Sequence, residues 1–135
     1  MEQKITKTYG KTGLHRLRDW QVLLKQLDSV PEREKIVSIN QFFNSQIIFQ
    51  DDKDLWSSAD YWATPLETLG KGAGDCEDFT IAKYFTLLEA GVAVEKLRFI
   101  YVKAQIGDSN SRVFQAHMVL GYYETETSVP YILDN

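Results

Sequence analysis

The hydrophobic pattern of this chain changes at Gly91, and this change most constrains the fold. Before Gly91, apolar residues recur every three or four positions, which is the spacing of an amphipathic helix. The pattern predicts one helix over residues 14–28, a second from Pro31 to about Asn44, and a third that begins around Cys76. Gly91 lies where the third helix would end, since glycine readily takes the left-handed conformation that follows many helices.

After Gly91 the chain becomes rich in aromatic and β-branched residues. Three such runs, at 97–104, 113–123 and 129–133, are separated by turn-forming residues, and the first two are expected to form a hairpin. Helices followed by consecutive antiparallel strands predict an α+β fold in which the N-terminal helices pack on an antiparallel sheet.

The length and charge of the chain limit the classes of function that it can have. The 135 residues suit one domain, expected to span residues 1–135. The net charge of −4 argues against nucleic acid as a partner. No apolar run approaches the roughly 20 residues that cross a bilayer, so we expect no direct membrane insertion. No signal peptide is visible, and the sequence stops on its third strand, so we expect a chain trimmed at both ends.

The only cysteine, Cys76, follows Gly72-Ala73-Gly74 at the predicted start of a helix. A thiol at a helix N-terminus lies near unpaired N–H groups and the positive end of the helix dipole, which favour the thiolate. A lone cysteine is most often a small buried apolar residue. Cys76 instead stands between charged residues, which favours the interpretation that it is a nucleophile.

Later in the sequence, His117 and Asp134 could complete a catalytic set with Cys76. His117 lies on the second predicted strand and is a better placed base than His15, which lies in the polar N-terminal segment. Asp134 follows the third strand and could orient the imidazole, as could the neighbouring Asn135. Cysteine, histidine and aspartate in this order suit a nucleophile, its base and the group that orients the base.

Three carboxylates, Asp75, Glu77 and Asp78, surround the thiol. The structural explanation is helix capping, with Asp75 as the N-cap and acids in the first turn. The functional one is a cation site, since three negative charges should raise the pKa of the thiol and a bound cation would offset them. Oxygen ligands favour Ca²⁺ over Zn²⁺, although the spacing does not match an EF-hand loop.

Two other patterns have structural explanations. Thr64, followed by proline and then Glu67, predicts a capping box at the start of a short helix. The aromatic residues Trp56, Tyr61 and Trp62 are expected to pack in the core or line a cleft.

Together, several segments resemble the bacterial transglutaminase-like cysteine proteinases, and among them the LapG-type periplasmic proteases that release large biofilm adhesins. The resemblance extends from about Ile36 to Asn135. The segments that carry it are 40–44, 60–67, 74–79, 81–84, 117–120 and 133–135.

The resemblance implies a papain-like or transglutaminase-like core, a Cys76–His117–Asp134 triad, and a Ca²⁺ site that uses Asp75 and Glu77 with Asp78 nearby. It implies a periplasmic enzyme that cleaves a large adhesin near its N-terminus, at small residues such as Ala-Ala, so that the adhesin is released and the biofilm disperses. It also implies inhibition by an inner-membrane receptor for cyclic di-GMP. The missing export signal departs from the family, whose members also usually continue past the triad aspartate.

The sequence thus predicts a calcium-dependent cysteine endopeptidase. One alternative is another acyl-transfer enzyme on the same scaffold, a transglutaminase or an amidase, which would use the same triad. The other is a non-catalytic module that binds peptides, which would not need all three of Cys76, His117 and Asp134.

Overall fold

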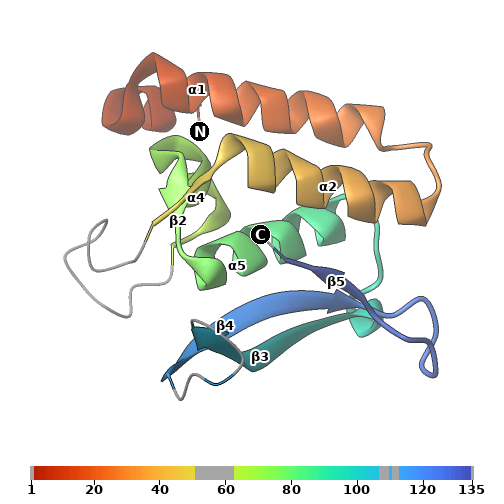
Figure 1. Cartoon of the computed structure of the whole chain (residues 1–135). Coiled ribbons are helices and arrows are strands. Elements are labelled where there is room, and N and C mark those ends of the chain that lie inside the picture. Colours follow the sequence, from red (N-terminus) through yellow and green to blue (C-terminus); the bar gives the residue numbers. More distant parts are fainter. Residues whose placement is uncertain (1, 51–62, 107–109, 111–112, 135) are drawn as a thin grey trace.

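Helices cover one face of a small antiparallel sheet in this protein (Figure 1). The computed structural model describes residues 2–50, 63–106, 110 and 113–134. The predicted α+β class is confirmed, since the described α-helices all precede residue 90 and the main antiparallel sheet follows it. Trp56, Tyr61, Trp62 and Asn135 lie outside the described residues.

Within the described residues, four α-helices precede the main sheet. They are α1 (Glu2–Gln26), α2 (Glu32–Gln46), α4 (Pro65–Lys71) and α5 (Cys76–Glu89). A short 3₁₀ helix, η1 (Val94–Lys96), leads into the sheet.

The first helix begins twelve residues before the predicted start, at Glu2 rather than at residue 14. Gly10 interrupts it with φ 75° and ψ −168°, so α1 is two helical segments joined by a kink. The first segment carries few apolar residues, and its buried contact comes from Ile5. A polar segment of this kind gives little hydrophobic periodicity, which explains why sequence patterning did not find it.

The other predicted helices are confirmed, with small shifts at their ends. Pro31 takes the N-cap position of α2, one residue before the first turn, and α2 continues two residues past Asn44. Thr64 begins α4 with the predicted capping box, since its Oγ1 accepts the N–H of Glu67 and the Glu67 carboxylate accepts the N–H of Thr64.

The main sheet has the strand order β3 (Leu97–Ile106), β4 (Val113–Tyr122) and β5 (Tyr131–Leu133). Both pairings are antiparallel, and β4 is the central strand. The predicted hairpin of the first two strands is therefore confirmed. A second ladder, which pairs β1 (Ile48–Phe49) with β2 (Ala73–Gly74) in parallel, was not predicted, because two-residue strands leave no periodic signal.

Helix α5 packs against β4 on one side and against α2 on the other (Figure 1). Burial of a large apolar side chain stabilises a fold by about 1.5–3 kcal/mol, and this core contains many of them. The largest fully buried apolar side chains are Leu17, Ile36, Ile39, Phe43, Leu69, Phe79, Leu87, Leu120 and Leu133.

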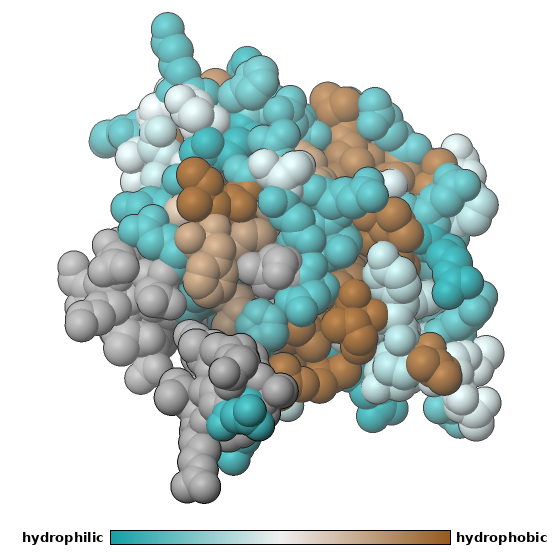
Figure 2. Space-filling view, viewed as in Figure 1, coloured by the Kyte–Doolittle hydropathy of each residue, from teal (hydrophilic) through white to brown (hydrophobic). Residues whose placement is uncertain are grey.

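The surface mixes polar and apolar residues. On the coloured part of the face shown in Figure 2, hydrophobic residues form several separate patches among hydrophilic ones. Across the described part of the chain, none of the helices combines the length and the apolar character that crossing a membrane requires.

Candidate active site

Cys76 is the first residue of α5, as the sequence predicts. Asp75 is the N-cap, and its Oδ1 accepts the N–H of Asp78 at 3.0 Å. In return, Oδ2 of Asp78 accepts the N–H of Asp75 at 3.1 Å, which completes a capping box. Gly74 lies so close to this turn that a Cβ there would be 2.7 Å from the Asp78 Cβ. The local sequence thus fixes where the helix begins, and with it the position of the thiol.

Asp78 has a structural role in this turn. Its side chain is fully buried, at 0% exposure, and its Oδ1 accepts the N–H of Ala63 at 3.0 Å. Both carboxylate oxygens of Asp78 thus accept backbone N–H groups. The expectation that Asp78 also lies near a bound calcium ion stays a prediction.

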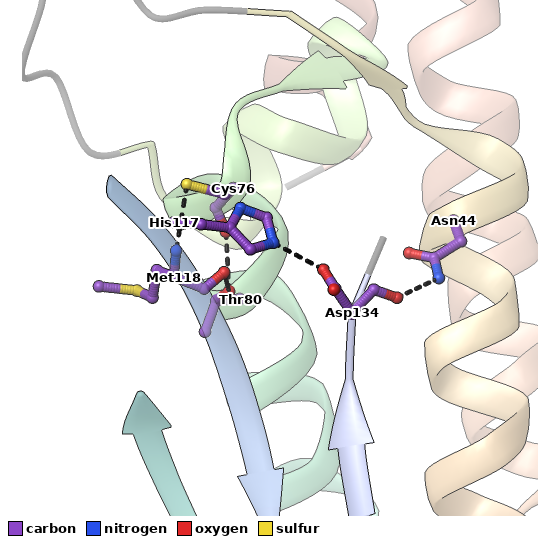
Figure 3. Close-up of polar contacts among 6 residues, drawn as sticks. All are labelled: Asn44, Cys76, Thr80, His117, Met118 and Asp134. Carbon is purple, nitrogen blue, oxygen red and sulfur yellow. Dashed lines mark hydrogen bonds and ion pairs between the residues drawn. The ribbon is translucent and has the colours of Figure 1, made fainter. Parts of the chain in front are cut away.

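The thiol of Cys76 contacts β4, the strand that carries His117. The N–H of Met118 donates to the Cys76 Sγ at 3.5 Å (Figure 3). Thr80, which is 2% exposed on the first turns of α5, bridges the same two elements. Its Oγ1 lies 2.7 Å from the carbonyl oxygen of Cys76 and 3.2 Å from that of Met118, and its single proton is shared between them. The start of α5 is therefore joined to β4 beside His117.

A short hydrogen bond joins His117 and Asp134. The Nε2 of His117 lies 2.7 Å from Oδ1 of Asp134, and the exposed fractions of the two side chains are 24% and 52%. An ionised carboxylate only accepts hydrogen bonds, so Nε2 carries a proton in this contact. The other ring nitrogen, Nδ1, lies on the side of the ring nearer Cys76 (Figure 3). In the neutral ring Nδ1 is the acceptor, the form that a base for the thiol requires.

The backbone of Asp134 is held from α2. The side-chain amide of Asn44 donates from Nδ2 to the carbonyl oxygen of Asp134 at 2.7 Å (Figure 3). The structure thus brings together Cys76, His117 and Asp134, the three residues predicted as the triad, from a helix, a strand and the segment after another strand. Asn44 and Thr80 were missed as parts of this site, because neither carries a signal in the sequence that separates it from ordinary polar helix residues.

The pKa of the Cys76 thiol is raised, which differs from the expectation for a helix N-terminus. Burial is the largest cause, and the charges of Asp75 and Glu77 add to it. The N–H groups of Met118 and Glu77 act in the opposite direction, but they are outweighed. The prediction that neighbouring carboxylates oppose ionisation is thus supported for two of the three, although desolvation is the larger effect.

A buried lysine lies further along α5. Lys83 is seven residues after Cys76, and its side chain is 1% exposed. Its Nζ lies 5.5 Å from the centre of the Phe79 ring. Burial lowers its pKa from 10.5 to about 8, although attraction to the Asp134 carboxylate opposes this. The sequence gives one hint of this burial, since Lys83 follows Ala82 within an otherwise apolar helical segment.

Calcium fits part of this arrangement. Asp75 and Glu77 are partly exposed on either side of the thiol, and their charges raise the pKa of both Cys76 and Tyr101, after burial as the largest cause. Oxygen donors of this kind suit Ca²⁺. Across the described residues, no group of three or more His, Cys, Asp or Glu side chains is close enough to hold a metal ion. Asp75 and Glu77 alone would therefore supply only part of the about six to eight oxygens that Ca²⁺ takes.

Comparisons with known proteins agree with this geometry. Residues 22–135 match the family described as bacterial transglutaminase-like cysteine proteinase BTLCP. The calcium-bound structure of LapG from Legionella pneumophila is 38% identical, with a TM-score of 0.78 over 98% of this chain and 70% of that one. The EGTA-treated structure of the same protein is 39% identical, with a TM-score of 0.79 over 98% of this chain and 68% of that one. The chain matches none of the curated proteins.

Proposed function

The chain belongs to the bacterial transglutaminase-like cysteine proteinase family, and from this premise we propose that it is a calcium-dependent cysteine endopeptidase whose nucleophile is Cys76. The observation that carries the proposal is the contact between the Cys76 Sγ and the strand of His117, whose imidazole is already bonded to Asp134. The family also resembles transglutaminases, so the experiment below determines whether water or an amine accepts the acyl group.

In the proposed mechanism, Nδ1 of His117 takes the proton of the Cys76 thiol, and the thiolate attacks the carbonyl carbon of the scissile peptide bond. The N–H of Met118 stabilises the thiolate, since it already donates to the sulfur. The C–N bond then breaks, and His117 returns the proton to the leaving amine. Water subsequently attacks the acyl-enzyme, again with His117 as base, and releases the acid.

Asp134 orients His117 through this cycle. Its carboxylate accepts a hydrogen bond from the Nε2–H group, so the ring presents Nδ1 to the thiol and the imidazolium is stabilised once it forms. The backbone N–H of Cys76, at the first position of α5, is one proposed donor to the oxyanion of the tetrahedral intermediate.

The proposal includes calcium, which Asp75 and Glu77 would help to hold. Its support is the donor chemistry of these two residues and the calcium-bound structure of the similar LapG protein. When bound, the ion supplies positive charge that offsets the two carboxylates beside the thiol. In its absence, burial and the charges of Asp75 and Glu77 keep the pKa of Cys76 raised.

The substrate and setting that we propose come from the family resemblance. The substrate is a large surface adhesin cut near its N-terminus at an alanine-rich site, and the location is the periplasm. Release of the adhesin would disperse the biofilm, and an inner-membrane receptor for cyclic di-GMP would inhibit the enzyme.

The test is incubation of the wild-type chain and the Cys76→Ala variant with an alanine-rich N-terminal adhesin fragment in the presence of Ca²⁺. We expect the wild type to give two fragments, with a new carboxylate from water on the N-terminal one, and Cys76→Ala to give none. Mass spectrometry identifies the products. Incorporation of an amine into glutamine without backbone cleavage would favour a transglutaminase, release of ammonia an amidase, and binding without chemistry a peptide-binding module.

A further inference from the structure

The three residues of the proposed triad lie on or next to secondary-structure elements of different lengths. Cys76 belongs to the 14-residue helix α5, and His117 lies within the 10-residue strand β4, opposite Val102 of β3. Asp134 follows β5, a strand of three residues whose pairing with β4 ends at Leu133. Its side chain is also more exposed than that of His117, its hydrogen-bond partner. The acid is therefore the member whose position depends most on contacts outside the sheet.

Asn44 supplies such a contact. Its Nδ2 donates to the carbonyl oxygen of Asp134 at 2.7 Å, across 90 positions of the sequence (Figure 3). The position of Asn44 is well defined, because the preceding residue, Phe43, is fully buried and anchors this end of α2 in the core. Through the carbonyl, the bond restrains the backbone of Asp134.

The choice of the carbonyl as acceptor has a consequence for the carboxylate. Asn44 restrains the backbone of Asp134 without occupying the side-chain oxygen that faces His117, which lies 2.7 Å from Nε2. The arrangement suits a residue that places the acid without contacting the oxygen that binds His117.

We propose that Asn44 is a positioning residue of the active site, which acts through Asp134 to hold the carboxylate against His117. This inference rests on the proposed triad. Asn44 is exposed, so its substitution removes little packing and should leave the stability of the fold nearly unchanged. Loss of one hydrogen bond of ordinary strength should lower the fraction of correctly placed Asp134 about three- to tenfold.

The test compares Asn44→Ala and Asn44→Asp with the wild type. The aspartate variant keeps the shape of the side chain but loses the N–H donor. Ser45→Ala is the matched control, since Ser45 is the next exposed residue of α2 and its hydroxyl bonds only to the Phe42 carbonyl within that helix. Two quantities are measured: kcat and KM for cleavage of the adhesin fragment, and the NMR resonance of the His117 Nε2 proton in the chain without substrate.

Both Asn44 variants should lower kcat about three- to tenfold with little change in KM, and both should shift or broaden the Nε2 proton resonance. Ser45→Ala should change neither, and the melting temperature should stay constant in all three. An unchanged resonance and kcat in both variants would overturn the inference, and so would a lower kcat that only follows a lower melting temperature. If the wild type itself does not cleave, the proposed function fails instead, and the resonance still decides whether Asn44 positions Asp134.

Discussion

Replacement of Lys83 by methionine should stabilise the protein at neutral pH. The Lys83 side chain is 1% exposed, and its pKa falls from 10.5 to about 8 on folding, mainly because burial disfavours the charged form. At about 1.4 kcal/mol for each pKa unit, this difference corresponds to roughly 3–4 kcal/mol of unfavourable free energy at pH 7. Methionine keeps an unbranched chain against Phe79 but carries no charge to desolvate.

The expected gain in the free energy of unfolding is smaller than the unfavourable free energy of the buried Lys83 charge. The ammonium lies 5.5 Å from the centre of the Phe79 ring, and the variant loses this cation–π contact, worth about 1–2 kcal/mol at a desolvated site. We therefore expect Lys83→Met to raise the free energy of unfolding by about 2 kcal/mol at pH 7, in line with other buried charges replaced by apolar residues. For a chain of this size the melting temperature should rise by about 6–10 °C.

The gain should depend on pH in one direction. Below pH 8 both the folded and the unfolded state hold the Lys83 proton, so the full penalty is present. Between pH 8 and 10.5 the folded state binds fewer protons than the unfolded state, so this lysine destabilises the wild type less and less as the pH rises. The advantage of Lys83→Met should therefore be constant below pH 8 and should shrink toward pH 10.5.

Urea unfolding of both proteins at several pH values between 6 and 10.5 measures this difference directly. Lys7→Met, which changes an exposed lysine of α1, is the control and should show no comparable gain. If Lys83→Met is less stable than the wild type at pH 7, or if its advantage does not shrink between pH 8 and 10.5, the ammonium is better paired than its burial suggests and the reasoning is wrong.

Three further predictions concern the site. Thr80→Val should lower kcat/KM about tenfold, because the bridge from α5 to the Met118 carbonyl is lost, whereas Thr80→Ser should retain most of the activity. Thr68→Val is the control, since the buried Thr68 hydroxyl has no hydrogen-bond partner among the described residues. Asp134→Asn should lower kcat by at least a hundredfold with an unchanged melting temperature, and near-normal turnover would mean that another group orients His117. A calcium chelator should inactivate the wild type, with recovery on added Ca²⁺, and Glu77→Gln should need more Ca²⁺ for half-maximal activity; full activity in chelator would return this carboxylate to a helix-capping role.

Local signals accounted for most of the secondary structure. The capping boxes at Thr64 and Asp75, and the helix that starts at Cys76, could be read from a few adjacent residues, because capping depends on side chains three positions apart. The hairpin of β3 and β4 followed from two long runs of strand-forming residues. The segment before Gly10 and the ladder of β1 with β2 were missed, because one is too polar and the other too short to give a periodic pattern.

The raised pKa of the Cys76 thiol depends mainly on an effect that local sequence does not predict. The sequence predicts two opposing local effects on the pKa of Cys76, since a helix N-terminus lowers it and the neighbouring carboxylates raise it, and the thiol does lie at the helix start. Burial, however, comes from the packing of α5 against the sheet, and it outweighs the N–H groups that act on the sulfur. Desolvation is a property of the whole surroundings of an atom, which no run of neighbouring residues specifies.

The sequence by itself determined which residues could perform the chemistry: one cysteine at a helix start, a strand histidine and an aspartate after a strand. Only the tertiary structure decided that Met118, 42 positions after Cys76, meets the thiol, that Asn44 reaches Asp134 across 90 positions, and that Lys83 is buried. Helix and strand propensities act over a few residues. Contacts between distant segments arise only when the helices and the sheet bury their apolar faces together, and that packing sets the distances within the site.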